Sequence, residues 1–386
     1  MNPLADLKND LELRKLENLY RTRQILYSPQ GVEVNCNGKK LLSFCSNDYL
    51  GLANDPRLIE ANFLGMKKYG VGSGAAHLIS GHSHSHHLLE QELSDFLGVE
   101  RVLLFSTGYM ANVGILTSLM SRNDIIFQDK LNHASLIDGG LQSRARLRRY
   151  DHLDTIMLES MLEKIENKSL IASDGVFSMD GVRAPIENLI QLSNQFNSAL
   201  LIDDAHGFGV LGENGKGSIH ALGLSMSKVP LYVATLGKAL GTMGAFVAGS
   251  EELIETLIQR ARSYIYTTAM PPSLAEATRA SLKIMASENW RRLHLTDLVN
   301  RFRAGAKEFD LELVNSDTPI QPIILGNAET ALRWSNTLFE KGILINAIRP
   351  PTVPEGSARL RITFSATHQI EHIDYLLGEL RRLSEN

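Results

Sequence analysis

The stretch Ala199-Leu200-Leu201-Ile202-Asp203-Asp204-Ala205-His206-Gly207 decides the fold, because an apolar run ends abruptly in two carboxylates and an imidazole. Short apolar runs of this kind are typical of strands buried on both faces of a parallel sheet. Side chains alternate along a strand, so Asp203 and Asp204 point to opposite faces and only one can serve a given site. A single Asp here would most simply cap a turn, so the neighbouring segments decide its role.

Similar apolar runs occur on both sides of this stretch and alternate with helical patterns, which indicates a mostly parallel sheet flanked by helices. In open α/β sheets, ligands bind beyond the carboxyl ends of the strands, so we expect the site at these ends. Besides residues 199–203, the predicted strands are 101–105, 124–128, 170–174, 231–234 and 244–248.

The chain divides into three predicted parts. Leucines at near-helical spacing in residues 3–24 predict an amphipathic arm, and Asn37-Gly38 between alternating runs predicts a hairpin. We therefore expect an arm and hairpin in residues 1–45, a large α/β domain in 46–285, and a smaller α+β domain in 286–386.

Composition excludes several classes of protein. The 386 residues are 44% hydrophobic and 21% charged, which predicts a globular fold, and a net charge of -4 provides no basic field for nucleic acid or an anionic membrane. Two cysteines, Cys36 and Cys45, are too few for a disulfide framework. No apolar segment has the length of a signal peptide or membrane span. We expect a cytoplasmic protein that acts on small molecules.

Lys238 follows the predicted strand 231–234 within Thr235-Leu236-Gly237-Lys238-Ala239-Leu240-Gly241. A lysine crowded by backbone at a strand end is poorly hydrated, which favours the neutral amine that condenses with carbonyl groups. An ordinary surface lysine with its head group in water explains this residue alone equally well.

Lys238 and Asp203 together indicate pyridoxal phosphate (PLP). This cofactor needs a lysine for its aldehyde, an acid against its pyridine nitrogen and donors for its phosphate. The segment Phe105-Ser106-Thr107-Gly108-Tyr109 turns from a strand through glycine into a helix, whose free N–H groups suit an anion.

The segment Gly207-Phe208-Gly209-Val210-Leu211-Gly212 fits the G-x-G-x-x-G pattern of dinucleotide-binding proteins. That interpretation requires an acid about twenty residues further on for the ribose, and residues 217–250 contain no Asp or Glu. We therefore interpret these glycines as turn residues. Neither a nucleotide-triphosphate loop nor a nucleophile elbow is found.

Two histidine features leave alternatives open. The cluster His77, His82, His84, His86 and His87 has no matching Cys or carboxylate set at ligand spacing, so we expect solvated or capping histidines and no metal. His133 begins a predicted helix, and it either caps that helix or stacks on a flat cofactor ring.

Four motifs in chain order resemble those of the α-oxoamine synthases, which are fold-type I PLP-dependent transferases. These motifs are Ser46-Asn47-Asp48-Tyr49-Leu50-Gly51, Asp174-Gly175-Val176-Phe177-Ser178-Met179-Asp180-Gly181, Asp203-Asp204-Ala205-His206-Gly207 and Thr235-Leu236-Gly237-Lys238. The resemblance implies decarboxylative condensation of an amino acid with an acyl-CoA thioester, in a homodimer whose active sites are shared.

The resemblance also assigns roles to single residues. Lys238 would bind the cofactor aldehyde and later remove the α-proton of the amino acid, with Asp203, His133 and His206 as further catalytic residues. Asp203 would contact the pyridine nitrogen and His133 would stack on the ring. The remaining cofactor contacts would be Ser178 and His206 at the ring hydroxyl, Gly108, Tyr109 and Thr235 at the phosphate, and Thr267 and Thr268 from the second subunit.

For the substrates, Arg361 looks like the clamp on the amino-acid carboxylate and is preferred over Arg359. Asn47, in the first motif, is a further expected substrate-binding residue. Arg21 and Thr352 match positions that contact the acyl chain. The segment Ala347-Ile348-Arg349-Pro350-Pro351-Thr352-Val353-Pro354 is most similar to the biotin-pathway member, which uses L-alanine and a pimeloyl thioester.

Two alternatives and two departures accompany this resemblance. A sibling enzyme condenses glycine with acetyl-CoA, and a non-catalytic scaffold subunit of the same fold would be expected to lack Lys238 or Asp203. The chain departs from the family pattern at Ala75-Ala76-His77 and at Phe208.

Overall fold

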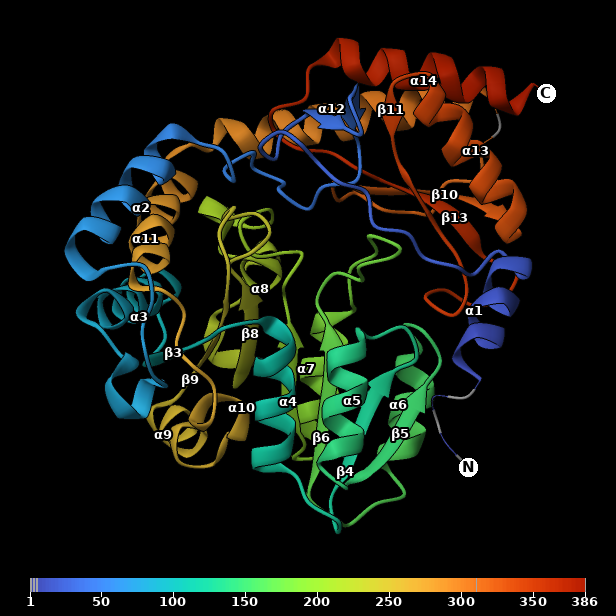
Figure 1. The fold of residues 1–386 in the computed structure, drawn as a ribbon. Coiled ribbons are helices and arrows are strands. Elements are labelled where there is room, and N and C mark those ends of the chain that lie inside the picture. Colours follow the sequence, from blue (N-terminus) through green and yellow to red (C-terminus); the bar gives the residue numbers. More distant parts are fainter. Residues whose placement is uncertain (1, 3, 5, 310, 386) are drawn as a thin grey trace. The chain divides into compact units, whose positions relative to one another are not determined.

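The computed structural model describes every residue except 1, 3, 5, 310 and 386 (Figure 1). The chain forms two compact units. The large unit comprises residues 50–178 and 182–292, and the small unit comprises residues 1–49, 179–181 and 293–386.

The large unit contains a seven-stranded sheet in the order β3-β9-β8-β7-β6-β4-β5. Its strands are β3 (Arg101–Phe105), β4 (Ile125–Asp129), β5 (Arg146–Tyr150), β6 (Ser169–Asp174), β7 (Ala199–Asp203), β8 (Leu231–Thr235) and β9 (Ala245–Gly249). Only β9 runs antiparallel to its neighbours, which confirms the predicted mostly parallel sheet.

The predicted strands differ from the observed ones by at most one residue at either end, but β5 was not predicted. Its sequence Arg146-Leu147-Arg148-Arg149-Tyr150 carries three arginines, and it lies at the edge of the sheet. Charged side chains are common on edge strands because they discourage pairing with other chains, and they remove the apolar pattern by which a strand is recognised.

Helices surround this sheet because its strands are apolar on both faces. Helices α4 and α5 lie against the sheet in Figure 1, and the apolar side chains of α4 join a core with Phe105, Leu201 and Val247. The helices are α2 (Pro56–Tyr69), η1 (His77–Gly81), α3 (His84–Leu97), α4 (Gly108–Leu119), α5 (Ala134–Gln142), α6 (Thr155–Leu162), α7 (Ile186–Gln195), η2 (Glu213–Gly215), α8 (Ser218–Ala221), η3 (Met226–Lys228), α9 (Glu251–Arg260), α10 (Arg262–Ile265) and α11 (Pro272–Ser287).

The small unit contains two three-stranded sheets, β1-β2-β11 and β10-β13-β12. Its strands are β1 (Glu33–Cys36), β2 (Lys39–Ser43), β10 (Ile320–Gly326), β11 (Ile343–Leu344), β12 (Asn346–Ile348) and β13 (Ala358–Thr363). Its helices are α1 (Leu7–Leu16), η4 (Lys307–Phe309), α13 (Ala328–Glu340) and α14 (Ile370–Ser384), together with most of α12 (Trp290–Ala306).

The hairpin between β1 and β2 forms as predicted, since Asn37 and Gly38 both adopt positive φ angles of 52° and 82°. The predicted arm is shorter than expected. Residues 3 and 5 lie outside the described part, and α1 covers only ten residues, none of them buried. Leu7, Leu11 and Leu16 are therefore exposed in the single chain.

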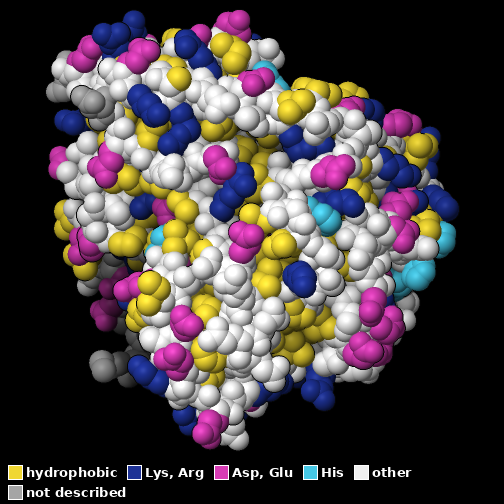
Figure 2. All heavy atoms as spheres, turned by 180° about the vertical axis from the view of Figure 1, so that it is seen from behind, with side chains coloured by type: hydrophobic (Ala, Val, Ile, Leu, Met, Phe, Trp, Pro, Cys, Tyr) yellow, Lys and Arg dark blue, Asp and Glu magenta, His cyan; other side chains and the backbone are white. Residues whose placement is uncertain are grey.

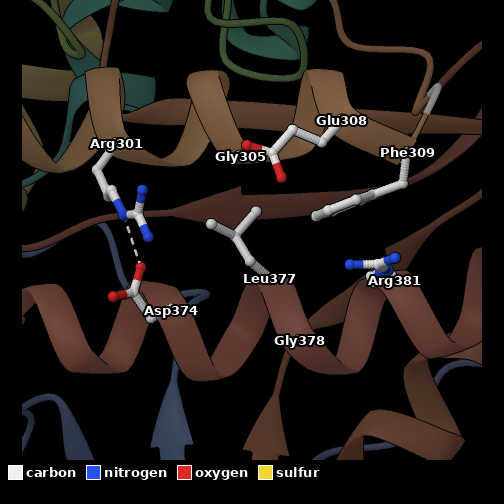
Figure 3. Close-up of a pocket in the computed structure, with 8 residues that line it drawn as sticks. All are labelled: Arg301, Gly305, Glu308, Phe309, Asp374, Leu377, Gly378 and Arg381. Atoms are coloured by element: carbon white, nitrogen blue, oxygen red, sulfur yellow. Dashed lines mark hydrogen bonds and ion pairs between the residues drawn. The ribbon is translucent and has the colours of Figure 1, made fainter.

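A surface pocket of about 170 Å³ lies between α14 and the end of α12 in the small unit (Figure 3). Both arginines of the lining are already paired, because Arg301 binds Asp374 at 2.7 Å and Arg381 binds Glu385 at 2.9 Å. The Arg381 guanidinium also lies over the ring of Phe309. Because both arginines already have acidic partners, we assign this pocket no ligand.

Positive and negative side chains are interspersed on the face shown in Figure 2. This pattern agrees with the low net charge of the chain. Among the described helices, none combines the length and apolar character required to cross a bilayer.

Candidate active site

A pocket of about 170 Å³ lies in the large unit, where several strands of the parallel sheet end. Asp174 and Asp203 are the last residues of β6 and β7, and Thr235 is the last residue of β8. The structure brings together eight of the ten predicted cofactor residues in its lining: Gly108, Tyr109, His133, Ser178, Asp203, His206, Thr235 and Lys238.

Lys238 and His206 contact each other in this pocket. The Nζ atom of Lys238 lies 2.7 Å from Nε2 of His206, a hydrogen-bonding distance. His206 is buried by the turn that follows β7, and Lys238 lies just beyond β8. Adjacent parallel strands thus place an amine and an imidazole side by side.

The carboxylate of Asp203 is buried and held by two donors. Its Oδ1 accepts from the backbone N–H of Ala205 at 3.0 Å, and its Oδ2 accepts from Nδ2 of Asn112 at 2.6 Å. Asn112 lies on α4 and is fully buried. A charged acceptor makes these hydrogen bonds stronger than neutral ones, so they fix the direction of the carboxylate.

Asn112 also connects Asp203 to His133. Its Nδ2 donates to Oγ of Ser135 at 2.8 Å, and that hydroxyl lies 2.7 Å from Nδ1 of His133. Because the Ser135 oxygen accepts from Asn112, its proton is available to His133. The backbone N–H of Ser135 donates to the same Nδ1 at 3.3 Å. Nδ1 of His133 is therefore an acceptor, and a neutral ring carries its proton on Nε2.

Burial lowers the pKa of His133, so its neutral form is favoured. Both interpretations of this residue hold in part: His133 is the N-cap of α5, and its side chain also lines the pocket. Asn112 and Ser135 were missed by the sequence reasoning. The sequence feature that could have revealed this contact is Asn112 itself, a polar residue one turn into the mostly apolar helix α4.

Asp174 is a second buried acid beside Asp203. Its Oδ2 accepts from the backbone N–H of His133 at 2.9 Å. Burial, followed by the nearby charge of Asp203, raises the pKa of Asp174 well above its usual value. The pair therefore favours a single negative charge in the pocket wall.

Asp204 points away from this pocket, as strand alternation predicts. It accepts from the backbone N–H of Ser218 at 2.7 Å, from the Ser218 hydroxyl and from the Tyr232 hydroxyl at 2.8 Å. A Cβ atom at Gly207 would lie 2.0 Å from Oδ1 of Asp204. Gly207 is therefore needed for close packing of this turn, which agrees with the interpretation of the 207–212 glycines as turn residues.

One end of the pocket is formed by the start of α4. The Thr107 side chain caps this helix by accepting from the N–H of Met110 at 3.2 Å, and Gly108 and Tyr109 follow in its first turn. The backbone N–H groups of a first turn lack partners within the helix and attract anions. Thr235 is held nearby, since its hydroxyl donates to the Gly244 carbonyl at 3.0 Å.

Two predicted cofactor residues, Thr267 and Thr268, do not line the pocket of their own chain. Thr268 instead forms an antiparallel bridge with Ala76, and its carbonyl accepts from the Ser106 hydroxyl at 3.3 Å. Their expected contribution to a second subunit stays a prediction.

The four predicted substrate residues belong to the small unit and form two pairs. Both terminal nitrogens of Arg361 lie 3.2 Å from Oδ1 of Asn47. Arg21 donates to the Thr352 hydroxyl at 3.3 Å. Arg359, the less favoured clamp, makes a buried ion pair with Asp180 and so already has a carboxylate partner.

At the two departures from the family pattern, the structure shows aromatic packing of Phe208 and His77. Phe208 is buried and packs edge-on against Phe246, with ring centroids 5.1 Å apart. His77 stacks on Tyr264 at 5.0 Å. Neither side chain lines the pocket described above.

The histidine cluster is partly as predicted. His86 caps α3, because its Nδ1 accepts from the backbone N–H of Ser83 at 3.0 Å. His82 and His87 are exposed, whereas His77 is buried, so the expectation of solvation is wrong for His77. The expectation that no carboxylate accompanies these histidines is also wrong, since Glu90 lies within reach of His82 and His87.

Comparisons with known proteins agree with this geometry. A family model described as aminotransferase class I and II matches residues 39–380. The 8-amino-7-oxononanoate synthase of Nitrosococcus oceani is 54% identical over 372 residues, which cover 96% of this chain and 99% of that protein. The synthase of the same name from Saccharophagus degradans is 54% identical over 379 residues, covering 97% and 96%.

Solved structures show the same fold. Sphingomonas wittichii serine palmitoyltransferase matches with a TM-score of 0.95 at 28% identity, covering 100% of this chain and 98% of that chain. A high-resolution structure of SPT with PLP matches with a TM-score of 0.94 at 28% identity, covering 100% and 99%. The 8-amino-7-oxononanoate synthase from Francisella tularensis has a TM-score of 0.78 at 36% identity, covering 89% and 97%.

The chain therefore belongs to the class I and II aminotransferase family and has the fold-type I architecture. Its similarity to these synthases confirms the α-oxoamine synthase resemblance predicted from the motifs.

Proposed function

We propose that this chain is a PLP-dependent acyltransferase that condenses L-alanine with a pimeloyl thioester. The products are 8-amino-7-oxononanoate, carbon dioxide and the free thiol carrier, in a step of biotin biosynthesis. Near-full-length relatives with this name support the proposal. The observation that carries it is the convergence of Lys238, Asp203 and the start of α4 on one pocket.

The donor set of the pocket fits PLP. Lys238 provides an amine for the aldehyde, Asp203 an acid for the pyridine nitrogen, and the first turn of α4 provides N–H groups for the phosphate. When bound, this cofactor withdraws electrons from the α-carbon of the amino acid. The remaining chemistry belongs to the protein side chains.

Asp203 would keep the pyridine nitrogen of the cofactor protonated, because Asn112 and Ala205 already orient its carboxylate. His133 offers a neutral, flat ring as a stacking surface, with its tautomer fixed by Ser135. The pocket therefore holds its polar groups in place and requires little reorganisation.

Lys238 would hold the cofactor through its amine, and the same amine would serve as the base for the α-proton of the amino acid. Nε2 of His206 lies 2.7 Å from this amine and restricts its position. Ser178 and His206 bind the ring hydroxyl of the cofactor.

The small unit supplies the substrate contacts. Arg361 binds the alanine carboxylate with its planar fork, and Asn47 orients that fork. Arg21 and Thr352, which contact each other, bind the pimeloyl chain, whose terminal carboxylate requires a cation. Thr267 and Thr268 complete the phosphate site of the partner copy, so the enzyme acts as a homodimer. Its place of action is the cytoplasm.

Steady-state rates with two substrate pairs test this proposal. We expect turnover with L-alanine plus pimeloyl-CoA, or pimeloyl carrier protein, to exceed turnover with glycine plus acetyl-CoA. Preference for the glycine pair would instead identify the sibling enzyme that forms 2-amino-3-oxobutanoate. A purified protein without a visible absorption band that borohydride bleaches would indicate the scaffold alternative.

A further inference from the structure

A second group of ligand atoms lies in the large unit, on residues other than those that line the active-site pocket. One ring nitrogen of His82, one of His87 and a carboxylate oxygen of Glu90 all lie within 4.8 Å of one another. His87 and Glu90 are three residues apart on α3 and therefore share one face of the helix. His82 reaches the same point from the loop that precedes the helix.

The side chain of His82 is oriented by a second histidine. Its Nδ1 lies 2.9 Å from Nδ1 of His77, which is buried and stacked on Tyr264. Its Nε2 faces Glu90, at 3.9 Å from Oε2. Metal-binding histidines typically use one nitrogen for the ion and the other for an orienting partner. A cation at Nε2 of His82 would leave the ring proton on Nδ1, which then donates to His77.

Glu90 lacks a strong counter-charge. Only 15% of its side chain is exposed. Its Oε1 accepts from the backbone N–H of Leu104 at 3.0 Å, whereas Oε2 faces Nε2 of His82 at 3.9 Å. Arg101 acts on this carboxylate electrostatically but pairs directly with Glu251. A bound cation would compensate a charge that the protein itself compensates poorly.

His86 is excluded from this site although it lies close to His77 and His82. Its Nδ1 accepts from the backbone N–H of Ser83, and its Nε2 donates to the Met270 carbonyl at 2.7 Å. Both ring nitrogens are thus used in holding α3, and neither has a lone pair left for a metal.

We propose that His82, His87 and Glu90 bind a divalent transition-metal ion, and that Zn²⁺ is the ion that fits best. Two imidazoles and one carboxylate match zinc coordination, with solvent as the fourth ligand on the exposed side of His82 and His87. Mg²⁺ prefers all-oxygen ligands and fits poorly. Ligand atoms around tetrahedral zinc lie about 3.3 Å apart, so the observed separations require only small side-chain rotations. The ion would fasten the loop before α3 to the helix.

Zinc binding by the tag-free holoenzyme tests the proposal. After chelator treatment, the protein is dialysed against micromolar Zn²⁺ and its metal content is measured, with Mg²⁺ as a separate arm. We expect one Zn²⁺ per chain and no retained Mg²⁺. His87→Ala and Glu90→Gln should each weaken zinc binding at least tenfold, whereas His84→Ala, an exposed histidine outside the group, should bind like wild type.

His87 is exposed, so His87→Ala keeps the test valid if Glu90→Gln folds poorly. Absence of stoichiometric zinc in wild type, or equal zinc binding by wild type and His87→Ala, would overturn the proposal. Because these residues lie outside the active-site lining, His87→Ala should also keep the acyltransferase rate of wild type. The outcome therefore does not depend on the proposed reaction.

Discussion

Asp203 and Asp204 are neighbours in sequence, but their surroundings give them different roles. Asp203 lines the pocket and accepts from Asn112, whereas Asp204 accepts from Ser218 and Tyr232 in a buried network. At the scale of single residues, strand alternation was sufficient to predict that they diverge. It did not reveal Asn112 or Ser135, because their contacts join residues that only the fold brings together.

Asp203→Asn should slow loss of the α-proton from L-alanine by about 10²–10³-fold, the usual effect of removing one preorganised electrostatic group. The neutral amide cannot stabilise a protonated pyridine nitrogen. Exchange of the alanine α-proton with deuterated solvent, followed by NMR, measures this step directly. Exchange at the wild-type rate in a folded variant would refute the role of Asp203.

Asn112→Ala should weaken PLP binding about 5- to 150-fold. The variant leaves the Asp203 carboxylate without one donor, which costs about 1–3 kcal/mol. Titration of the apo-protein with PLP, followed by absorbance, measures the affinity. Asn194→Ala, on the exposed surface of α7, is the matched control. If both variants bound PLP equally well, Asn112 would not position the acid.

Asp204 should make the stability of the protein depend on pH. Burial raises the pKa of Asp204 to about 6 from the usual 3.8, so its favourable contribution is complete below pH 3.8 and is lost as the pH rises through 6. Asp204→Asn removes this titration. The free-energy difference between wild type and variant in urea unfolding should change by about 1–2 kcal/mol from pH 5 to pH 8, in favour of the variant. A difference independent of pH would contradict the assigned shift.

At the scale of elements, the carboxyl ends of β6, β7 and β8 position the site, and the turn after β7 requires glycine. A Cβ atom at Gly207 would lie 2.0 Å from Asp204 and 2.4 Å from the Ser218 hydroxyl. The sequence predicted these strands because each is a short apolar run. It missed β5, whose arginines hide the pattern, and Glu90, which reaches the histidine cluster only because α3 turns it toward the loop.

Gly207→Ala should lower the free energy of unfolding by about 1–3 kcal/mol, as overpacking of a tight interior does. Gly378→Ala is a control of opposite sign. Gly378 is an exposed position on α14 with no atom within 4 Å of an added Cβ, so alanine there should stabilise the helix by about 0.5–1 kcal/mol. Thermal unfolding compares the two variants, and an equal effect of both would contradict the packing argument.

At the scale of the whole molecule, the chain combines a large unit that holds the cofactor residues with a small unit that holds Arg361, Asn47, Arg21 and Thr352. The sequence predicted both groups from local motifs. It could not predict that the N-terminal 49 residues group with the C-terminal ones, since that association depends on long-range strand pairing such as β2 with β11.

The central claim is that Lys238 carries the cofactor in this pocket. Reduction of the purified holoenzyme with borohydride, followed by proteolysis and mass spectrometry, identifies the labelled lysine. We predict one pyridoxyl group per chain, on the peptide that contains Thr235-Leu236-Gly237-Lys238. A label on another lysine, or no label in a preparation that retains PLP, would contradict the account.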